Sequence, residues 1–281
     1  MNDLNLNTAH AKYTTTSIAE GVATITMNRP DKLNGWTMEM MDAFKAAFKK
    51  ADAHDDVKAI ILTSTGKYYS AGVNLAGTIK IMPPKALREL IIEHNQNLFE
   101  AFLQVKKPLL VAVNGPAIGA SVTSATLSNY VIAGESATFS TPFAALGIVP
   151  EGCSSIHFAR LMGEETAQRM LGEEGWKPTA TEAQAAGLIQ KVVPNEKLEK
   201  EAFKIAKAWA KKSEQRQFLG GSELKELLEV NAKESAALAD AFLSAAFMKE
   251  QGRFLWSKKK RVPAATFFAL WASRPVWSLL L

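Results

Sequence analysis

The alternation of apolar and polar residues predicts a β-hairpin near the start of the chain. Residues that favour strands alternate over 14–18 and again over 22–27, and Glu20-Gly21 separates the two runs. Such an interruption suits a tight turn. A loop is expected over 28–34, because Pro30 and the asparagines of this stretch break regular structure.

Helical spacing begins after this loop. Thr37 can cap a helix that runs to about Ala53. Its apolar stripe consists of Met38, Met41, Phe44, Ala47 and Phe48. A second helix is expected over 85–106, and Pro108 ends it. The apolar side of that helix consists of Leu87, Leu90, Ile91, Leu98, Phe102 and Val105.

Two continuous apolar runs, over 57–63 and 109–113, are typical of strands that are buried on both faces. Each run leads into a turn that contains glycine, the first at 70–73 and the second at 115–119. Because the polar loops follow the strand ends, the pattern predicts an α/β layered domain with its site at the carboxyl ends of the strands.

The rest of the chain is mainly helical after Cys153. Short strands are expected over 130–133, 137–140 and 189–193, and helices over 120–127, 163–171, 181–187, 195–212 and 222–249, the last range holding one or two of them. Residues 181–184 resemble a capping box. A change in composition near Pro194 predicts a core domain over 1–194 and a helical C-terminal region over 195–281.

Composition excludes several classes of function. The net charge of +5 fits an anionic ligand, but there is no basic stripe interleaved with aromatic residues, so no nucleic acid is expected. Four histidines without metal-ligand spacing give no metal site. The single cysteine, Cys153, cannot form an internal disulfide and suggests a reducing compartment. Pro263, Arg274 and Pro275 interrupt the apolar tail, so no membrane span is expected.

Candidate chemistry lies in the two glycine turns. Gly119 permits a tight turn before a helix whose first N–H groups have no intrahelical partner, and Gly72 can direct the N–H of Val73 outward. Each turn could therefore present a backbone donor to a developing oxyanion. Each could equally need glycine for its geometry alone.

Glu151 is the candidate acid–base residue. It follows Pro150 and precedes Gly152, at the end of the apolar run Leu146-Gly-Ile-Val-Pro. A glutamate in such a turn is often only solvated. Cys153 is better explained as a small buried residue than as a nucleophile, although His157 could in principle activate it.

The combination of these stretches resembles the crotonase (enoyl-CoA hydratase/isomerase) superfamily. The resemblance rests on the strand 57–63 with Tyr-Ser-Ala-Gly-Val-Asn-Leu at 69–75, on Lys-Pro-Leu-Leu-Val-Ala-Val-Asn-Gly-Pro-Ala-Ile-Gly at 107–119, and on the segment 137–150. Asn-Arg-Pro-Asp-Lys-Leu-Asn at 28–34 matches too. The resemblance implies a spiral of ββα units with a helical C-terminal trimerisation region, and hence a homotrimer or a dimer of trimers.

The resemblance also implies an acyl-CoA thioester as substrate, with its carbonyl oxygen bound by the N–H groups of Val73 and Ala120. Hydratases of the family carry two glutamates, and Thr123 and Phe143 stand at those positions here. Neither residue can deprotonate water at neutral pH. Asn-Gly-Pro-Ala-Ile-Gly and Val-Pro-Glu-Gly are instead similar to the peroxisomal type of Δ3,Δ2-enoyl-CoA isomerase, which implies that Glu151 is the sole acid–base residue.

Substrate-binding residues follow from the same resemblance. Lys32, Lys67 and the basic run 258–261 are candidates for the CoA phosphates, although each could be a plain solvated charge. The turns and the acyl path contribute Ser70, Ala71, Gly72, Asn74, Leu75, Gly119 and Phe143. Met82, Leu87 and Ile91 could line an acyl tunnel, or could simply be core. No cofactor is expected, because coenzyme A is part of the substrate.

The sequence thus predicts an isomerase that shifts the double bond of a 3-enoyl-CoA to the 2-trans position in fatty acid degradation. Two alternatives are another crotonase-type reaction, such as hydration or a biosynthetic acyl-CoA step, and a non-catalytic trimer that binds acyl-CoA. Residues 1–12 lack the features of a secretory signal or a mitochondrial presequence. The resemblance favours a peroxisomal location, but the C-terminus is not of the Ser-Lys-Leu type, which leaves the cytoplasm as the alternative.

Overall fold

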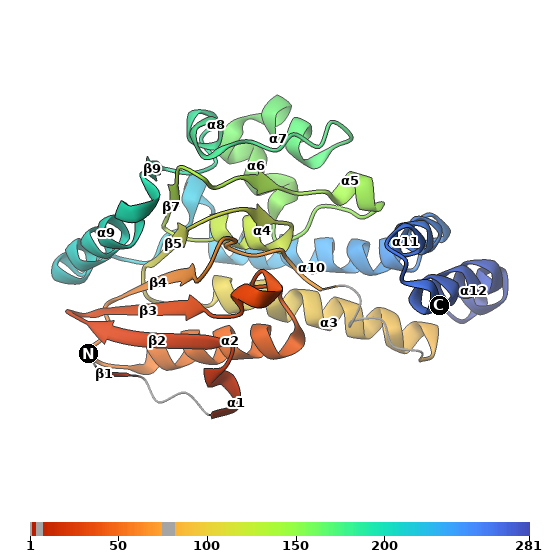
Figure 1. Cartoon of the computed structure of the whole chain (residues 1–281), viewed down its shortest axis with the longest axis horizontal. Helices are drawn as coiled ribbons and strands as arrows, with labels where there is room; N and C mark the ends of the chain where they lie inside the picture. The colour runs from red at the N-terminus through yellow and green to blue at the C-terminus, as the bar shows by residue number, and fades with distance from the viewer. Residues whose placement is uncertain (1, 4–7, 75–81) are drawn as a thin grey trace.

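A seven-stranded sheet forms the centre of the molecule (Figure 1). The computed structural model describes residues 2–3, 8–74 and 82–281. The strands lie in the order β1-β2-β3-β4-β5-β7-β9, and all pairings from β3 to β9 are parallel. Their bounds are β1 (Asn2–Asp3), β2 (Thr14–Ala19), β3 (Val22–Met27), β4 (Ala59–Ser64), β5 (Leu109–Val113), β7 (Tyr130–Gly134) and β9 (Lys191–Val193).

The predicted hairpin is confirmed. Strands β2 and β3 pair antiparallel with Thr14 opposite Met27 and Ala19 opposite Val22, so Glu20 and Gly21 make the turn. Both turn residues have positive φ, 49° and 80°, which is the geometry that a two-residue hairpin loop needs.

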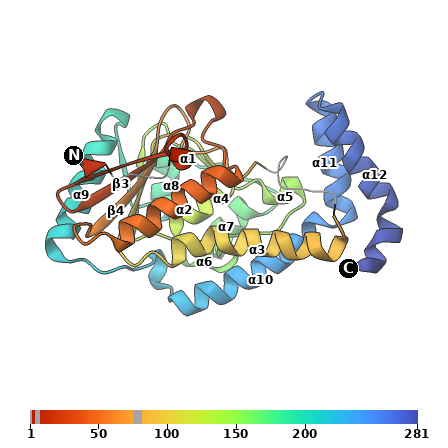
Figure 2. The same cartoon turned by 90° about the horizontal axis from the view of Figure 1, so that it is seen from below.

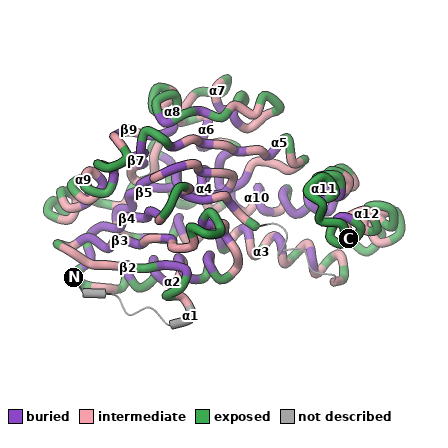
Figure 3. The backbone as a smooth tube through the Cα atoms, in the orientation of Figure 1, coloured by how far each residue is buried: buried purple, intermediate pink, exposed green. Residues whose placement is uncertain are grey.

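Strands β4 and β5 are buried along their whole length, as their continuous apolar runs predict. One face packs on α9 (Leu198–Lys212) through the small apolar cluster that includes Ile61, Leu110 and Ala202. The main core lies on the other face. Figure 3 shows that buried residues are concentrated in the central strands, whereas the outer helices carry many exposed residues. Because the strands from β3 to β9 are parallel, their carboxyl ends lie at one edge of the sheet.

A second sheet of two short parallel strands lies beyond that edge. It consists of β6 (Ala117–Ile118) and β8 (Phe139–Ser140). The pattern of residues does not predict β6, because two residues carry no readable period. Tertiary pairing alone defines it, and it fixes the turn that precedes α4 (Ala120–Thr126).

Helices cover the sheet and extend beyond it. Besides α4 and α9 they are α1 (Thr8–Ala11), α2 (Met38–Ala53), α3 (Pro84–Leu103), α5 (Phe143–Leu146), α6 (Ser154–Met162), α7 (Glu164–Leu171), α8 (Ala180–Ala186), α10 (Leu224–Phe242), α11 (Ala245–Ser257) and α12 (Arg261–Trp277), with 3₁₀ turns at Pro30–Lys32, Asn195–Lys197, Leu219–Gly221 and Ser278–Leu280. Helix α10 runs along α3, while α11 and α12 form a pair at one end of the molecule (Figure 2).

Several local predictions need correction. The hydroxyl of Thr37 does cap α2, but Met38 is only half-buried because it lines a pocket. Helix α3 ends at Leu103, before the predicted 106, and Leu90 is half-buried rather than core. The capping box is formed by Thr179 with Glu182 and not by residues 181–184, since Thr179 is the residue with extended backbone before α8. Helix α6 lies in the stretch predicted to be mainly helical, but its bounds were not predicted.

The division at residue 194 stays a prediction. It coincides with the end of β9, but α9 covers one face of the sheet and α10 lies against α3, so the C-terminal helices complete the core rather than stand apart. In the part of the chain that the structure describes, no helix is both long and apolar enough to cross a membrane.

Candidate active site

The two predicted glycine turns lie side by side. Gly72 and Gly119 both have positive φ, 78° and 60°, and each immediately precedes one of the proposed donors, Val73 and Ala120. A Cβ atom on Gly72 would lie 2.5 Å from the carbonyl oxygen of Ile118. Only glycine therefore allows the first turn to approach the second so closely.

Backbone hydrogen bonds hold the two turns in register. The N–H of Ile118 donates to the carbonyl of Ser70 at 3.1 Å, and the N–H of Gly119 donates to Ser140 at 2.7 Å. The hydroxyl of Ser70 donates to the carbonyl of Asn34 at 2.8 Å and accepts from the N–H of Gly72 at 3.0 Å. Ser70 is thus fully buried, and its side chain supports the turn.

The two donors differ in exposure: Val73 is half-buried and lines the pocket, whereas Ala120 is buried. No hydrogen bond within the described residues uses the N–H of Val73 or of Ala120. Ala120 is the first residue of α4, where the helix provides no acceptor for its N–H and contributes partial positive charge. The arrangement can bind an oxygen that carries negative charge.

Glu151 lies in the loop between α5 and α6. The two residues that follow it determine the course of this loop. Gly152 and Cys153 both have a φ of 64°, so the chain turns sharply just before α6. The side chain of Glu151 remains 8% exposed and lines a pocket. Burial raises the pKa of Glu151 to about 8, and repulsion from the carboxylate of Glu234 adds to the rise.

Asn95 of α3 is a site residue that the sequence analysis missed. Its Nδ2 donates to Oε2 of Glu151 at 3.2 Å, while its buried Oδ1 has no hydrogen-bond partner among the described residues. Asn95 is a polar residue within the buried stripe that Ile91, Leu98 and Phe102 form on α3. A polar side chain at a core position of an amphipathic helix was the available signal, because buried amides need partners.

Glu234 of α10 is a second missed residue. Its carboxylate accepts from the N–H of Cys153 at 2.6 Å and from the N–H of Ser155 at 2.8 Å. It therefore caps α6 and fixes the turn that follows Glu151. Burial raises the pKa of Glu234 to about 7, against the lowering effect of these hydrogen bonds. Glu234 does not line the pocket.

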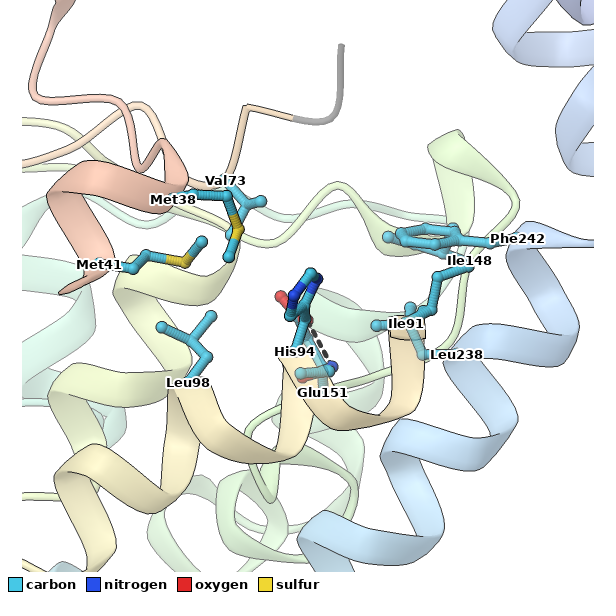
Figure 4. A pocket seen from close by; sticks show the side chains of 11 residues that line it. Met38, Met41, Val73, Ile91, His94, Leu98, Ile148, Glu151, Leu238 and Phe242 are labelled. Carbon is cyan, nitrogen blue, oxygen red and sulfur yellow. Dashed lines mark hydrogen bonds between the residues drawn. The ribbon is translucent and has the colours of Figure 1, made fainter. Parts of the chain in front are cut away.

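The pocket that contains Glu151 has a volume of about 80 Å³ and lies between α2, α3 and α10 (Figure 4). Its polar lining residues are His94, Asn95 and Glu151. On one side Met38, Met41, Val73 and Leu98 enclose it, and on the other Ile91, Ile148, Leu238 and Phe242 do so. A carboxylate with a raised proton affinity in an apolar pocket suits proton transfer to and from carbon.

Thr123 lies against the Glu151 loop. A Cβ atom on Gly152 would lie 2.6 Å from Oγ1 of Thr123 and 2.4 Å from the ring of Phe99. The loop thus occupies the space in front of Thr123. Phe143, at the second position where hydratases carry an acid, is buried and does not line the pocket.

The residues predicted to bind the substrate do not all lie at the pocket. Lys32 and Lys67 are exposed, as a phosphate contact needs, and Asn74 is exposed beside Val73. Leu75 lies outside the described residues. The basic run 258–261 lies between α11 and α12, away from the pocket, where Arg261 stacks on Trp256 at 3.9 Å from the ring centroid. Phe143 is not brought to the pocket, because it packs at the start of α5.

Cys153 and His157 are both buried, as expected for structural residues rather than for a nucleophile and its base. Cys153 is buried, its Sγ donates to the carbonyl of Leu227 at 3.2 Å, and burial raises the pKa of the thiol. His157 is buried too, with Nε2 3.0 Å from the carbonyl oxygen of Thr126. Within the described ranges there is no group of three or more His, Cys, Asp or Glu residues that could hold a metal.

Comparison with known proteins shows the family to which the chain belongs. The family model described as enoyl-CoA hydratase/isomerase matches residues 17–258. The chain is 35% identical over 255 residues to Enoyl-CoA delta isomerase 3, peroxisomal, from Mus musculus, covering 86% of this chain and 77% of that protein. It is 37% identical over 249 residues to Enoyl-CoA delta isomerase 2 from Homo sapiens, covering 86% of this chain and 62% of that protein.

Solved structures confirm the predicted fold class. A crystal structure titled enoyl-CoA hydratase/isomerase from Pseudoalteromonas atlantica T6c superposes with a TM-score of 0.76 at 28% identity, over 90% of this chain and 99% of that one. The α/β core with a helical C-terminal region is therefore of the crotonase type.

Proposed function

Since this chain belongs to the enoyl-CoA hydratase/isomerase family, we propose that it is a Δ3,Δ2-enoyl-CoA isomerase, which converts a 3-enoyl-CoA into the 2-trans-enoyl-CoA. The observation that carries the proposal is that Glu151 is the one carboxylate among the described residues lining the pocket beside Val73. The reaction would serve the degradation of unsaturated fatty acyl chains.

One base is enough for this reaction. The carboxylate of Glu151 removes a proton from C2 of the 3-enoyl thioester, and the electron pair of that C–H bond passes into a conjugated dienolate. The same carboxyl group then returns the proton to C4, so the double bond moves from C3–C4 to C2–C3. A raised proton affinity suits both steps, since the group must take up a proton from carbon and release it again.

The enolate oxygen would lie between the N–H groups of Val73 and Ala120. Each such donor lowers the barrier by about 3 kcal/mol when it is positioned before the charge develops. The fixed register of the two glycine turns provides that positioning, and among the described residues neither amide has another partner to leave. Lys32 and Lys67 are proposed to contact the CoA phosphates.

Hydration is the main competing reaction in this family. It needs a second group to hold and deprotonate water. Glu234 is the carboxylate whose charge acts on Glu151, but both of its oxygens accept backbone N–H groups and it does not line the pocket. The Glu151 loop packs against Thr123, and a threonine hydroxyl cannot deprotonate water at neutral pH.

The test uses purified protein with 3-trans-hexenoyl-CoA, and formation of 2-trans-hexenoyl-CoA is followed by absorbance. Glu151→Gln should reduce turnover by at least about a thousandfold while CoA binding and the unfolding transition persist. Glu93→Gln, an exposed change on α3, is the matched control. Full activity in Glu151→Gln, or water addition to the 2-enoyl-CoA in place of isomerisation, would overturn the proposal.

A deuterium-exchange assay separates the catalytic proposal from a purely binding role. In D₂O the isomerase should incorporate deuterium at C2 and C4 of the acyl chain, because the proton on Glu151 exchanges with solvent. A protein that binds acyl-CoA without exchange at either carbon would be the non-catalytic alternative.

We also propose that the chain assembles as a homotrimer or a dimer of trimers. The support is apolar surface at the C-terminal end, where Phe254, Trp256 and Val276 are exposed. Sedimentation equilibrium tests this directly, and a monomer at micromolar concentration would contradict it. The compartment stays a prediction, peroxisomal or cytoplasmic.

A further inference from the structure

A second apolar cavity lies next to the pocket of Glu151. It has a volume of about 160 Å³, and its lining includes Met82, Leu87, Phe242, Phe267, Leu270 and Trp277. None of these side chains is charged. The cavity is surrounded by a small apolar cluster that is separate from the main core.

The two cavities adjoin each other, and both are lined by α3 and α10. Phe242 lines both of them. On α3 the lining passes from Ile91 in the first cavity to Leu87 in the second, and on α10 from Leu238 to Phe242. A step of four residues is one helical turn, or about 6 Å, so the second cavity continues the first by one turn along both helices.

Helix α12 closes the far side of this second cavity. Phe267, Leu270 and Trp277 face it at helical spacing. The helix is held in place at two points: the ring of Phe268 packs on Gly252, where a Cβ atom would lie 2.7 Å from it, and Nε of Arg274 donates to the carbonyl of Leu243 at 2.8 Å. The closure is therefore a fixed wall.

This wall lies outside the part of the chain that the family model matches. The match ends at residue 258, and α12 begins at Arg261.

We propose that this second cavity binds the distal end of a long fatty acyl chain, and that α12 sets the longest chain the enzyme accepts. The inference rests on the proposed function for the position of the thioester, since the chain must pass Glu151 to reach Phe242. An acyl chain fits because the lining side chains are apolar and the cavity adjoins the site at Phe242, whereas a charged ligand would find no charged partner among these side chains.

The expected consequence is a dependence on chain length. Each buried methylene improves binding by roughly fourfold. Affinity for acyl-CoA should therefore rise through the medium chain lengths, and should stop rising once the chain reaches α12.

The first experiment measures binding of saturated hexanoyl-, decanoyl- and tetradecanoyl-CoA by calorimetry, in the wild type and in Leu270→Trp. The larger side chain fills the cavity, so the advantage of the longer chains over hexanoyl-CoA should shrink at least tenfold. Ala272→Trp introduces the same side chain at an exposed position of α12 that does not line the cavity and should leave that advantage intact. Because a larger residue can strain its surroundings, Leu270→Ala is measured too and should extend the preference to longer chains.

The second experiment repeats the series as turnover, using the ratio of kcat/KM for 3-tetradecenoyl-CoA to that for 3-hexenoyl-CoA. If the binding series behaves as expected but no 3-enoyl-CoA is isomerised, the proposed function fails and the cavity assignment stands. The cavity assignment is overturned if chain length gives no gain in wild-type affinity. It is also overturned if Met41→Trp, which fills the opposite side of the first pocket, removes the gain while Leu270→Trp does not.

Discussion

Nδ2 of Asn95 lies 3.2 Å from Oε2 of Glu151 and donates a hydrogen bond to it across two elements that are 56 residues apart. The carboxylate is otherwise surrounded mainly by apolar side chains. The amide thus restricts the side chain of Glu151 to one orientation, and it favours the charged form that accepts the proton.

Replacing Asn95 should slow the reaction without unfolding the protein. Asn95→Leu removes the donor at nearly constant volume, and a hydrogen bond to a charged group contributes ~1.5–3 kcal/mol, so kcat/KM should fall roughly 10- to 100-fold. Stability should hold or rise, because the change also removes the unpaired Oδ1. Steady-state kinetics and thermal unfolding check both points, with Asn97→Leu on the exposed side of α3 as the control.

Activity should depend on pH through Glu151. The base must be ionised to remove the proton, and burial raises its pKa to about 8, so kcat/KM should increase with pH and level off above about 8. Glu234→Gln removes the neighbouring negative charge and should move this limb to lower pH. Exposed Glu229→Gln on the same helix should leave the profile in place. An unshifted profile in folded Glu234→Gln would show that Glu234 does not influence the proton affinity.

The same burial should make Glu151 costly for stability at high pH. Its pKa is higher in the folded protein than in the unfolded chain, so the folded state holds a proton that the unfolded state releases. Stability from this group is therefore lost as pH rises from about 4.5 to about 8. Glu151→Gln should be more stable than the wild type at pH 9, by roughly 1–3 kcal/mol, and equal to it at pH 4. Urea unfolding at the two pH values tests the sign.

His157 should have the opposite influence on how stability changes with pH. It is fully buried, and desolvation lowers its pKa to about 4, so the unfolded chain binds a proton that the folded protein does not. Stability is present above pH 6.5 and is lost as pH falls toward about 4. His157→Gln should flatten this part of the stability curve, while His54→Gln, at a half-buried position, should not. A curve that stays equally steep after the first change would exclude His157 as its origin.

Replacing Gly152 should be more harmful than replacing Gly163, and the comparison separates backbone strain from steric collision. Gly152 and Gly163 both have positive φ, but a Cβ atom would collide with Phe99 and Thr123 at Gly152 and would meet nothing at Gly163. Gly163→Ala should cost about 1–2 kcal/mol from backbone strain alone. Gly152→Ala should cost at least ~2 kcal/mol more and abolish activity, because the Glu151 loop must move. Similar losses of stability in the two variants would contradict this account of the packing.

The sequence by itself determined the elements whose cause is local. The two apolar runs that become β4 and β5, the cap at Thr37 and the turn at Glu20-Gly21 each follow from the residues of one short segment. The resemblance in the glycine turns and in Val-Pro-Glu-Gly also identified the family, and with it the candidates Val73, Ala120 and Glu151.

Only the tertiary structure decided which side chains surround Glu151. Asn95 and Glu234 lie on helices whose pattern marks them merely as polar residues within a buried stripe, and their partners are distant in sequence. The acyl cavity depends likewise on α3, α10 and α12 meeting at one end of the molecule. Periodicity fixes the face of a helix that is buried, but a hydrogen bond or a cavity wall depends on which other element packs against that face, and that is a property of the whole fold.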